Sequence, residues 1–372
     1  MSNFLINCSN LRVGGGVQVA DSVCRELPKF KQHNFIVIYS KALISCAEDI
    51  KDYSNIKAIR YDIPKSLWAS ITCKNYFLDD IVRREDINAV LTIFGPSRWK
   101  PKVNHVCGFA RPHLVIPESP FWRQLNLRES VKFEVRNILM RYSFGKCARS
   151  FWSESSFIST RLKDIFPKSR VYTVSNNYNQ VFDDKTKWDT SVKLAKFDGM
   201  KLLTISANYP HKNLQIIIPT IKYLIKAHPN INFRFVLTLM ESQFPCLTKE
   251  EKEHLEFLGP VSIDQCPFLY EQCDAMFLPT LLECFSASYT EAMKMRKPIL
   301  TSNLDFAKAL CGDAAKYFDP VSEESVGESI YELAMDKELV EDLVSKGTKQ
   351  LVKFDSYSDR AKKLIGILER EC

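Results

Sequence analysis

Short apolar runs rich in β-branched residues recur along the chain, and stretches with helical spacing separate them. The strand candidates are 4–8 (FLINC), 35–39 (FIVIY), 89–95 (AVLTIFG), 201–206 (KLLTIS), 233–239 (FRFVLTL) and 275–280 (AMFLPT). Runs this apolar are typical of strands that are buried on both faces of a parallel sheet. Their alternation with helices predicts doubly wound α/β domains.

The pattern also predicts two domains. With 372 residues, the chain exceeds the usual size of one domain, roughly 100–200 residues. The polar, aperiodic stretch 179–199 predicts a linker between a first domain, 1–178, and a second, 200–355. Apolar residues at helical spacing in 356–372 predict a final helix, which packs back on the first domain or closes on the second.

Composition excludes several classes of protein. The chain is 45% hydrophobic and 26% charged, which is ordinary for a globular protein, and no apolar run approaches the ~18–20 residues of a membrane span. The first residues show no signal-peptide pattern. The 12 cysteines form no Cys-x-x-Cys pair, which argues against a zinc ribbon. We therefore expect a cytoplasmic protein with reduced thiols.

Positive charge is concentrated in the first half of the chain. Residues 1–180 contain 27 Lys and Arg against 15 Asp and Glu, whereas the remainder contains 24 against 29. This asymmetry favours one face that meets an anionic partner, although an ordinary charged surface stays open as an alternative. A nucleic-acid binder is less favoured, because acidic residues interrupt the basic ones and no recognised motif occurs.

Residues 121–149 are the most basic stretch, with seven basic and two acidic residues. Arg128, Lys132 and Arg136 share a helical face. Apolar contacts are expected from Phe121, Trp122, Phe133, Leu139, Met140, Tyr142 and Phe144. The stretch predicts an amphipathic helix on an anionic surface, here the inner face of the cytoplasmic membrane. The alternative is a solvated helix packed on its own domain.

Three glycines, Gly14, Gly15 and Gly16, stand between the first strand and a helix. Glycine lets backbone amides approach a ligand closely, and the helix N-terminus favours negative charge. The spacing is not a dinucleotide fingerprint, because Val19 stands where glycine or alanine is needed. An anion-binding loop and a tight turn without a ligand both remain open.

A second candidate site opens the second domain. A strand runs into Pro210-His211-Lys212, and in the helical stripe that follows Pro219 predicts irregular first turns. Lys212 therefore stands at the carboxyl end of a strand, where open α/β sheets bind ligands. Its point charge suits a diphosphate. The alternative is a solvated surface lysine.

The segment 279–293 (PTLLECFSASYTEAM) sets two carboxylates eight positions apart. Ser288 and Glu291 fit a capping box, which would give Glu291 a structural role, whereas no cap requires Glu283. The amides from Cys284 to Ala287 are expected to point toward an anion. Because carboxylates accept hydrogen bonds from paired hydroxyls, the arrangement favours a nucleotide sugar.

Taken together, these motifs resemble the retaining GT-B glycosyltransferases of family 4 across essentially the whole chain. The resemblance rests on Glu283 and Glu291 in 277–293, on the preceding segment 257–280, on YPHKNL, on the glycine loop and on 302–320. It implies an α/β protein with two Rossmann-like doubly wound domains that face each other across a cleft, with the active site between them.

The resemblance also implies roles for individual residues. Glu291 is expected to bind the ribose hydroxyls, and Glu283 the transferred sugar. Lys212 is expected to neutralise the diphosphate leaving group, with Gly15 and Gly16 facing it from the first domain. Further donor contacts are implied for Phe285, Ser286, Ala287, Asn303 and Leu304.

The chain departs from the family pattern in places. Ala207 stands where the family often has an arginine that contacts the diphosphate. His211 or Arg111 is the candidate to replace this contact. The family commonly has a sugar-contacting histidine in the first domain. His113 is the first candidate and His105 the second, with a polar surface niche as the alternative for His113.

The implied activity is hexosyl transfer from a nucleoside-diphosphate sugar to a hydroxyl of a growing, lipid-diphosphate-linked glycan, with retention. Bacterial polysaccharide or lipopolysaccharide assembly is the setting that the resemblance implies. The chain has no Asp-x-Asp, so neither a metal nor a cofactor is expected. Two alternatives remain, a GT-B enzyme of another activity such as an epimerase, and a non-catalytic nucleotide-sugar-binding scaffold.

Overall fold

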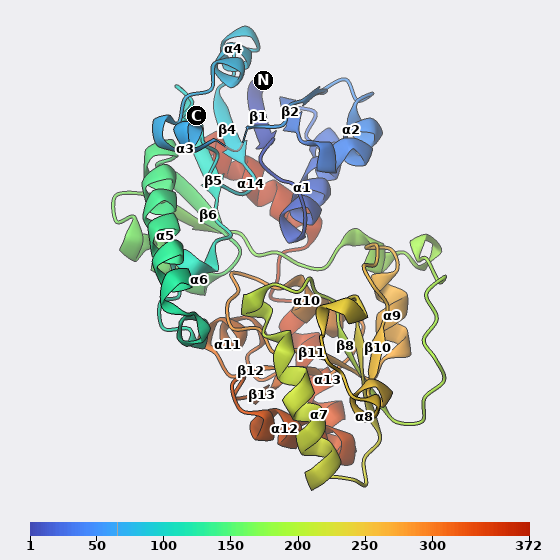
Figure 1. Ribbon diagram of the computed structural model, residues 1–372. Coiled ribbons are helices and arrows are strands. Elements are labelled where there is room, and N and C mark those ends of the chain that lie inside the picture. Colours follow the sequence, from blue (N-terminus) through green and yellow to red (C-terminus); the bar gives the residue numbers. More distant parts are fainter. Residues whose placement is uncertain (65) are drawn as a thin grey trace. The chain divides into compact units, whose positions relative to one another are not determined.

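The computed structural model describes residues 1–64 and 66–372, which divide into two units (Figure 1). Unit 1 comprises Met1–Pro117, Leu125–Asn176 and Asp355–Cys372, and unit 2 comprises Glu118–Gln124 and Asn177–Phe354. Each unit has a parallel sheet and its own hydrophobic core, so the predicted fold class, two doubly wound α/β domains, is confirmed. The predicted cleft stays a prediction, because the structure fixes each unit separately.

Unit 1 is built on a seven-stranded parallel sheet in the order β3-β2-β1-β4-β5-β6-β7. Its strands are β1 (Ser2–Cys8), β2 (His33–Tyr39), β3 (Ile56–Arg60), β4 (Ala89–Thr92), β5 (Asn104–Gly108), β6 (Ser150–Ser153) and β7 (Arg170–Thr173). The strand order reverses between β1 and β4, and ligands bind open α/β sheets at such a point. The glycine loop follows β1 there.

Successive side chains of β1 pack on opposite faces of this sheet. Phe4 and Ile6 belong to the core cluster that includes residues of α1, whereas Leu5 belongs to the cluster that includes Leu78 of α4. The helices of unit 1 are α1 (Gly15–Glu26), α2 (Ile44–Ile50), α3 (Leu67–Thr72), α4 (Tyr76–Arg84), α5 (Leu127–Cys147), α6 (Ser156–Ile165) and α14 (Tyr357–Glu371).

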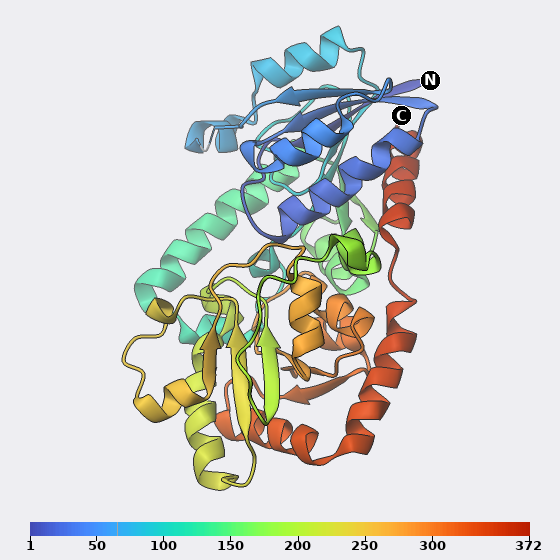
Figure 2. The same ribbon diagram turned by 90° about the vertical axis from the view of Figure 1, so that its right-hand side faces the viewer.

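The C-terminal helix α14 belongs to unit 1 and packs along α1 (Figure 2). Leu364 and Leu368 lie in the same core cluster as Val23 of α1. Arg360 is fully buried, and its guanidinium donates hydrogen bonds to Asn176 and Ser22. Hydrogen bonds from Nη1 and Nη2 offset part of the cost of burying this arginine and hold α14 on α1, whereas its Nε has no hydrogen-bond partner among the described residues.

Unit 2 is built on a six-stranded parallel sheet in the order β10-β9-β8-β11-β12-β13. Its strands are β8 (Met200–Thr204), β9 (Phe233–Leu237), β10 (Leu255–Phe257), β11 (Ala275–Leu278), β12 (Ile299–Ser302) and β13 (Ala315–Phe318). The order reverses between β8 and β11. Both predicted ligand loops of this domain, the one with Lys212 and the one with Glu283, follow these two strands.

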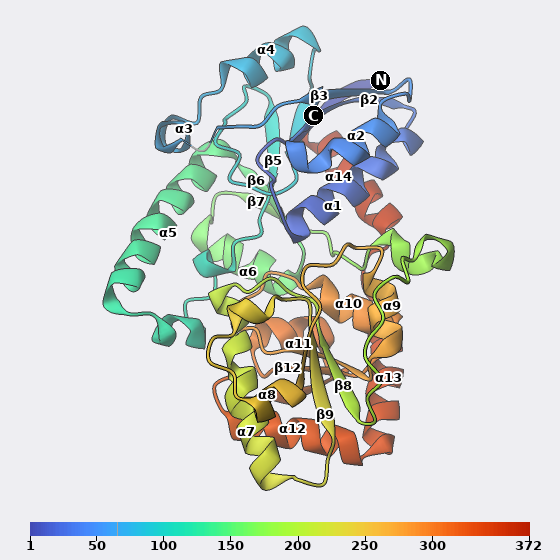
Figure 3. The ribbon, with the colours of Figure 1, turned by 45° about the vertical axis from the view of Figure 1, so that its right-hand side comes forward.

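The helices of unit 2 are α7 (Ile217–Ala227), α8 (Lys249–Glu253), α9 (Cys266–Gln272), α10 (Ala287–Lys294), α11 (Asp305–Cys311), α12 (Glu323–Met335) and α13 (Lys337–Leu351). Helix α12 packs on α7, and α13 packs on α10 (Figure 3). The irregular start predicted from Pro219 is present, because a 3-10 turn, Leu214–Ile216, precedes α7.

Two connecting segments are fixed to unit 2. The stretch 179–199, predicted as a linker, lies within this unit and is held by side chains of α9 and its neighbours. Gln272 accepts from the backbone N–H of Leu194 (2.9 Å), and Gln265 donates to Asp189 (2.9 Å). The segment Glu118–Gln124 also belongs to unit 2, although the sequence assigned it to the first domain.

Candidate functional site

The glycine loop of unit 1 leads directly into α1. Gly14 is the N-cap of the helix and has φ +77°, a conformation that requires glycine. A Cβ on Gly15 would meet no atom within 4 Å, so neither backbone strain nor packing requires glycine there. No side chain caps α1, and its first turn contains no acidic residue. The loop therefore presents a helix N-terminus that an anion can approach.

Lys212 lies beyond the carboxyl end of β8, in unit 2. The chain enters a 3-10 turn, Pro210–Lys212, and then Asn213 with φ +56°. Asparagine tolerates this left-handed conformation better than most residues. Its side-chain amide donates to the carbonyl oxygen of Pro320 at 2.7 Å, which fixes the turn and with it the position of Lys212.

The ammonium of Lys212 forms an ion pair with Oε1 of Glu283, and only 16% and 10% of the two side chains are exposed. The hydroxyl of Thr280 donates to the same oxygen at 3.1 Å. Leu281 N–H donates to the His211 carbonyl at 2.7 Å, which joins the two loops through their backbones. Lys212, Thr280 and Glu283 thus form one cluster, which we call the donor cluster.

The alternative interpretation of Glu291, a capping box with Ser288, is excluded by the structure. Helix α10 begins at Ala287 with Ser286 as its N-cap, and no side chain makes a capping hydrogen bond. Glu291 therefore lies beyond the first turn, where it is 6% exposed and accepts a hydrogen bond from the Tyr270 hydroxyl at 3.2 Å. Without a capping role, its carboxylate is available to a ligand.

Burial raises the pKa of Glu291 to about 7, because the low-dielectric surroundings disfavour its charged form. The hydrogen bond from Tyr270 opposes this shift only in part. Protonated and ionised forms of Glu291 therefore coexist at neutral pH. A ligand that donates hydroxyl hydrogens to the carboxylate would favour the ionised form.

His211 is a neutral residue of the site at pH 7. Burial, together with the charge of Lys212, lowers the pKa of His211 to about 4. Its ring stacks on Tyr209, with 5.7 Å between the centroids, and lies edge-on to Phe121. That His211 supplies the second phosphate contact in place of the missing arginine stays a prediction. Its ring can still take part in a neutral hydrogen bond.

The remaining predicted donor residues lie in loops that leave the same edge of the unit 2 sheet. One loop connects β11 with α10, and the other follows β12, the strand paired with β11. Phe285 and Ser286 lie in the first loop, which leads to Ala287 at the start of α10, and Asn303 and Leu304 lie in the second. Ser286 is buried and Asn303 is exposed. Their contacts with a donor stay predictions.

The two histidines predicted in unit 1 differ in environment. His105 is buried, with Nε2 2.8 Å from the Thr92 hydroxyl and Nδ1 2.8 Å from the carbonyl of Cys147. Burial lowers the pKa of His105 to about 4, so it is a neutral core residue and is excluded as a sugar ligand. His113 is half-buried and stacks on Phe133 at 5.4 Å, and it stays the candidate.

The segment Glu118–Gln124, which was not predicted to contribute, reaches the loops of the donor cluster. The hydroxyl of Ser119, 4% exposed, donates to the carbonyl of Leu281 at 2.7 Å. The Gln124 amide donates to Oδ1 of Asn213 at 3.3 Å. Pro117 and Pro120 predict a rigid loop, but they do not indicate which part of the protein this loop contacts.

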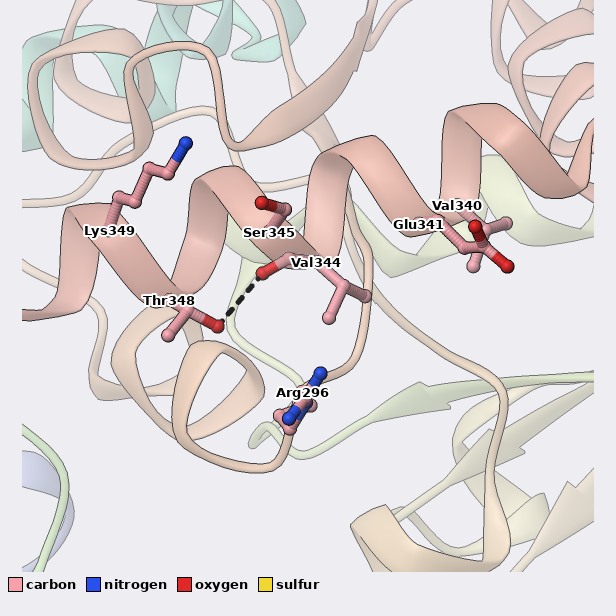
Figure 4. Close-up of a pocket in the computed structure, with 7 residues that line it drawn as sticks. All are labelled: Arg296, Val340, Glu341, Val344, Ser345, Thr348 and Lys349. Carbon is pink, nitrogen blue, oxygen red and sulfur yellow. Dashed lines mark hydrogen bonds between the residues drawn. The ribbon is translucent and has the colours of Figure 1, made fainter.

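A hollow of about 590 Å³ lies elsewhere in unit 2, between Arg296 and the outer side of α13 (Figure 4). Its remaining lining residues are Val340, Glu341, Val344, Ser345, Thr348 and Lys349. The Thr348 hydroxyl is bonded to the Val344 carbonyl of its own helix at 3.1 Å. None of the predicted donor residues lines this hollow, so we do not assign the donor to it.

Part of the chain matches a known protein family. Residues 186–350, which contain the donor cluster and Glu291, match the family model "Glycosyl transferases group 1". Unit 2 thus carries a glycosyl transferase group 1 domain. The chain is 22% identical over 284 residues, 74% of each chain, to the O-antigen chain mannosyltransferase RfbU of Salmonella typhimurium strain LT2.

Solved structures match the fold over the whole chain. One is the Anabaena protein Alr3699/HepE in complex with UDP and glucose (TM-score 0.66, 11% identity, all of both chains). Another is WaaG, a glycosyltransferase involved in lipopolysaccharide biosynthesis (TM-score 0.66, 11% identity, 98% of this chain and 99% of WaaG). At these identities the likeness establishes the fold alone. The fold is GT-B.

Proposed function

We propose that the protein is a retaining hexosyltransferase of family 4, which moves a sugar from a nucleoside diphosphate to a hydroxyl of a lipid-linked glycan. The observation that carries the proposal is the donor cluster. It places an ammonium and a carboxylate together at the carboxyl edge of the unit 2 sheet, within the matched domain. An activated sugar needs both kinds of group, one for its phosphates and one for its hydroxyls.

In the proposed reaction, the acceptor hydroxyl oxygen forms a bond to the anomeric carbon as the bond between that carbon and the diphosphate breaks. The departing diphosphate takes up the hydroxyl proton, and negative charge grows on it as it leaves. The 3-10 turn positions Lys212 to stabilise that charge. Stabilisation of developing charge by positioned groups is usually the largest single contribution to the rate acceleration of an enzyme. Amides of Phe285, Ser286 and Ala287 support Lys212 in this role. Glu283, held by Thr280, accepts hydrogen bonds from the sugar. We propose that no metal takes part.

Glu291 is proposed to bind the ribose. The two oxygens of its carboxylate are suited to accept hydrogen bonds from the two neighbouring ribose hydroxyls. The buried hydroxyl of Tyr270 already orients one of these oxygens. Nothing in this contact depends on the base, so the same residue serves a uridine or a guanosine donor.

RfbU is an O-antigen chain mannosyltransferase, and we propose a related role, in bacterial surface-polysaccharide assembly, for this protein. The proposed acceptor is a lipid-diphosphate-linked glycan, which the protein meets from the cytoplasmic side. A mannosyl donor is therefore the first to test, before other hexoses.

The test is a donor screen followed by a transfer assay. Thermal unfolding with UDP-, GDP- and dTDP-hexoses identifies the donor, because a ligand that binds only the folded state raises the unfolding temperature. Product formed from that donor and a lipid-linked acceptor, with and without EDTA, then reports activity, metal dependence and, by NMR, the anomeric configuration. The proposal predicts a retained anomer and no effect of EDTA. Donor binding without turnover would instead favour the non-catalytic scaffold.

A further inference from the structure

Helix α5 turns an apolar stripe toward solvent. Its outward apolar residues are all more than a third exposed: Leu127 (81%), Val131, Val135, Ile138, Leu139 and Tyr142. Spacings of three and four place these residues along one side of the helix. The opposite side packs on unit 1 through buried residues such as Asn137, Phe144 and Cys147. A helix on a protein surface normally exposes polar residues there, so this stripe needs a partner.

Basic side chains line one flank of the stripe, and Glu134 is exposed on the other. Arg128, Lys132 and Arg136 are all exposed and run parallel to it at four-residue spacing. At the far end of the helix, the Lys146 ammonium donates to the Tyr142 hydroxyl at 2.9 Å. The N-terminal turn is fixed by a capping box, in which the carboxylate of Glu129 is engaged by the backbone of Asn126.

Helix α3 extends the apolar surface. It packs against α5, and the Lys146 ammonium donates to the carbonyl of Ile71 at 2.8 Å (Figures 1 and 3). Leu67 is 63% exposed, and the side chain of Ile71 is exposed as well. The two helices thus form one surface, which we call the α3–α5 surface.

The residues that form it differ from those expected from the sequence. Phe121 and Phe144 are buried, so the prediction that they supply apolar contacts to a membrane is wrong, whereas Phe133 is half-buried and stacks on His113. Leu139 and Tyr142 do face outward. No pattern in the sequence indicates directly that Val131, Val135 and Ile138 are exposed, because apolar periodicity does not tell which side of a helix faces the core.

We infer that the α3–α5 surface lies on a bilayer that contains anionic lipids. An apolar stripe flanked on one side by cations along a helix matches the interface, where apolar side chains enter the acyl boundary and Lys and Arg meet phosphates. In the described residues, no helix is long and apolar enough to span a membrane, so contact would be peripheral. A symmetric dimer through this surface would bring two basic flanks together. The inference does not depend on the proposed activity.

Vesicle flotation without any donor tests the inference. The protein should float with vesicles of phosphatidylcholine and phosphatidylglycerol and stay behind with phosphatidylcholine alone. Each basic residue near such a surface contributes about 1 kcal/mol, so Arg128→Glu with Lys132→Glu should lower partitioning by tenfold or more. The matched control, Lys163→Glu with Lys168→Glu, makes the same charge change at exposed positions outside the surface and should bind like wild type.

A second variant tests the apolar contribution. Val131→Ser, Val135→Ser and Ile138→Ser together should also lower flotation at least tenfold, and because the three side chains are exposed, circular dichroism and thermal unfolding should be unchanged. Equal flotation of the α5 variants and wild type would overturn the inference, as would absence of wild-type binding. A dimer in light scattering that only the serine variant loses, with no flotation, would assign the surface to a second copy instead.

Discussion

Lys212 and Glu283 are joined by an ion pair in unit 2, although 71 positions separate them in the sequence. Thr280 donates to the same carboxylate oxygen, so Glu283 keeps a partner when the ammonium moves. In the proposed function, a diphosphate draws the ammonium away, and the same carboxylate oxygen can then accept from a sugar hydroxyl beside Thr280. The pair therefore couples recognition of the phosphates with recognition of the sugar.

Replacing Lys212 should reduce both turnover and stability. Lys212→Ala removes the charge that balances the leaving group, and donor kcat/KM should fall by about 10²–10³. It also leaves Glu283 nearly buried without its ion-pair partner, at a cost of about 3 kcal/mol in the free energy of unfolding. Urea unfolding and steady-state kinetics measure the two effects.

A double variant separates the effect of Lys212 on turnover from its effect on stability. Lys212→Ala with Glu283→Gln removes both charges, so most of the stability should return while turnover stays low. Recovery of turnover in the double variant would show that Lys212 acts on folding alone.

Stability should depend on pH through Glu291. Its pKa in the folded protein is about 7, against 4.5 for an ordinary glutamate, so the folded state binds more protons between these values. The free energy of unfolding should therefore decrease as pH rises from about 4.5 to 7, by up to about 3 kcal/mol. Glu291→Gln lacks this group, and the difference between variant and wild type should grow with pH. Parallel stability profiles from pH 5 to 8 would contradict the assignment.

Donor affinity should show the opposite dependence. The ionised form of Glu291 accepts both ribose hydroxyls, so the wild-type Kd for the donor should decrease as pH rises through 7. Calorimetric titration of Glu291→Gln should give a weaker Kd without this pH dependence. The variant would thus be more stable at pH 8 and bind the donor less well, a combination that a purely structural role for Glu291 does not produce.

The sequence predicted the sheets better than it predicted the loop contacts. Strands such as β1 and β11 are apolar on both faces, so their runs could be recognised locally. The contact of Lys212 with Glu283 depends on how two loops meet in space, and no local pattern encodes that. The capping box at Ser288 failed because its spacing fits a helix start that the chain does not use, since α10 begins at Ala287.

The environments of His105 and His113 and the contact of Ser119 could not be predicted from local sequence patterns either. His105 and His113 are eight positions apart, yet one lies in the core and the other is half-buried in a turn, because β5 ends between them. That Ser119 binds a loop of unit 2 could not be read from its neighbours, because the bond spans 162 positions.

Ser119 should position the donor cluster without touching the donor. Ser119→Ala leaves the nearly buried carbonyl of Leu281 without its partner, which should cost about 1–3 kcal/mol in stability. The donor KM should rise several-fold, with a smaller change in kcat. Ser119→Thr keeps the hydroxyl and should restore the KM. A KM that is equal in all three proteins would show that the segment does not position the cluster.

Alanine substitutions at Gly14 and Gly15 should have different effects on stability. Gly14→Ala forces a side chain into the left-handed region and should destabilise the protein by about 1–2 kcal/mol. Gly15→Ala fills open space at a helix start and should leave the unfolding temperature equal or higher. If the amides of this loop bind the diphosphate, Gly15→Ala should still weaken donor binding. Unchanged donor Kd in this well-folded variant would assign the loop to a turn without a ligand.

The most direct test of the account is nucleoside diphosphate release from a series of UDP-, GDP- and dTDP-hexoses by wild type, Lys212→Ala and Glu283→Gln. We predict that wild type releases the diphosphate from one donor class, and that each substitution in the donor cluster lowers the rate at least a hundredfold while the protein stays folded. Equal rates in all three proteins, or no release from any donor by wild type, would contradict it.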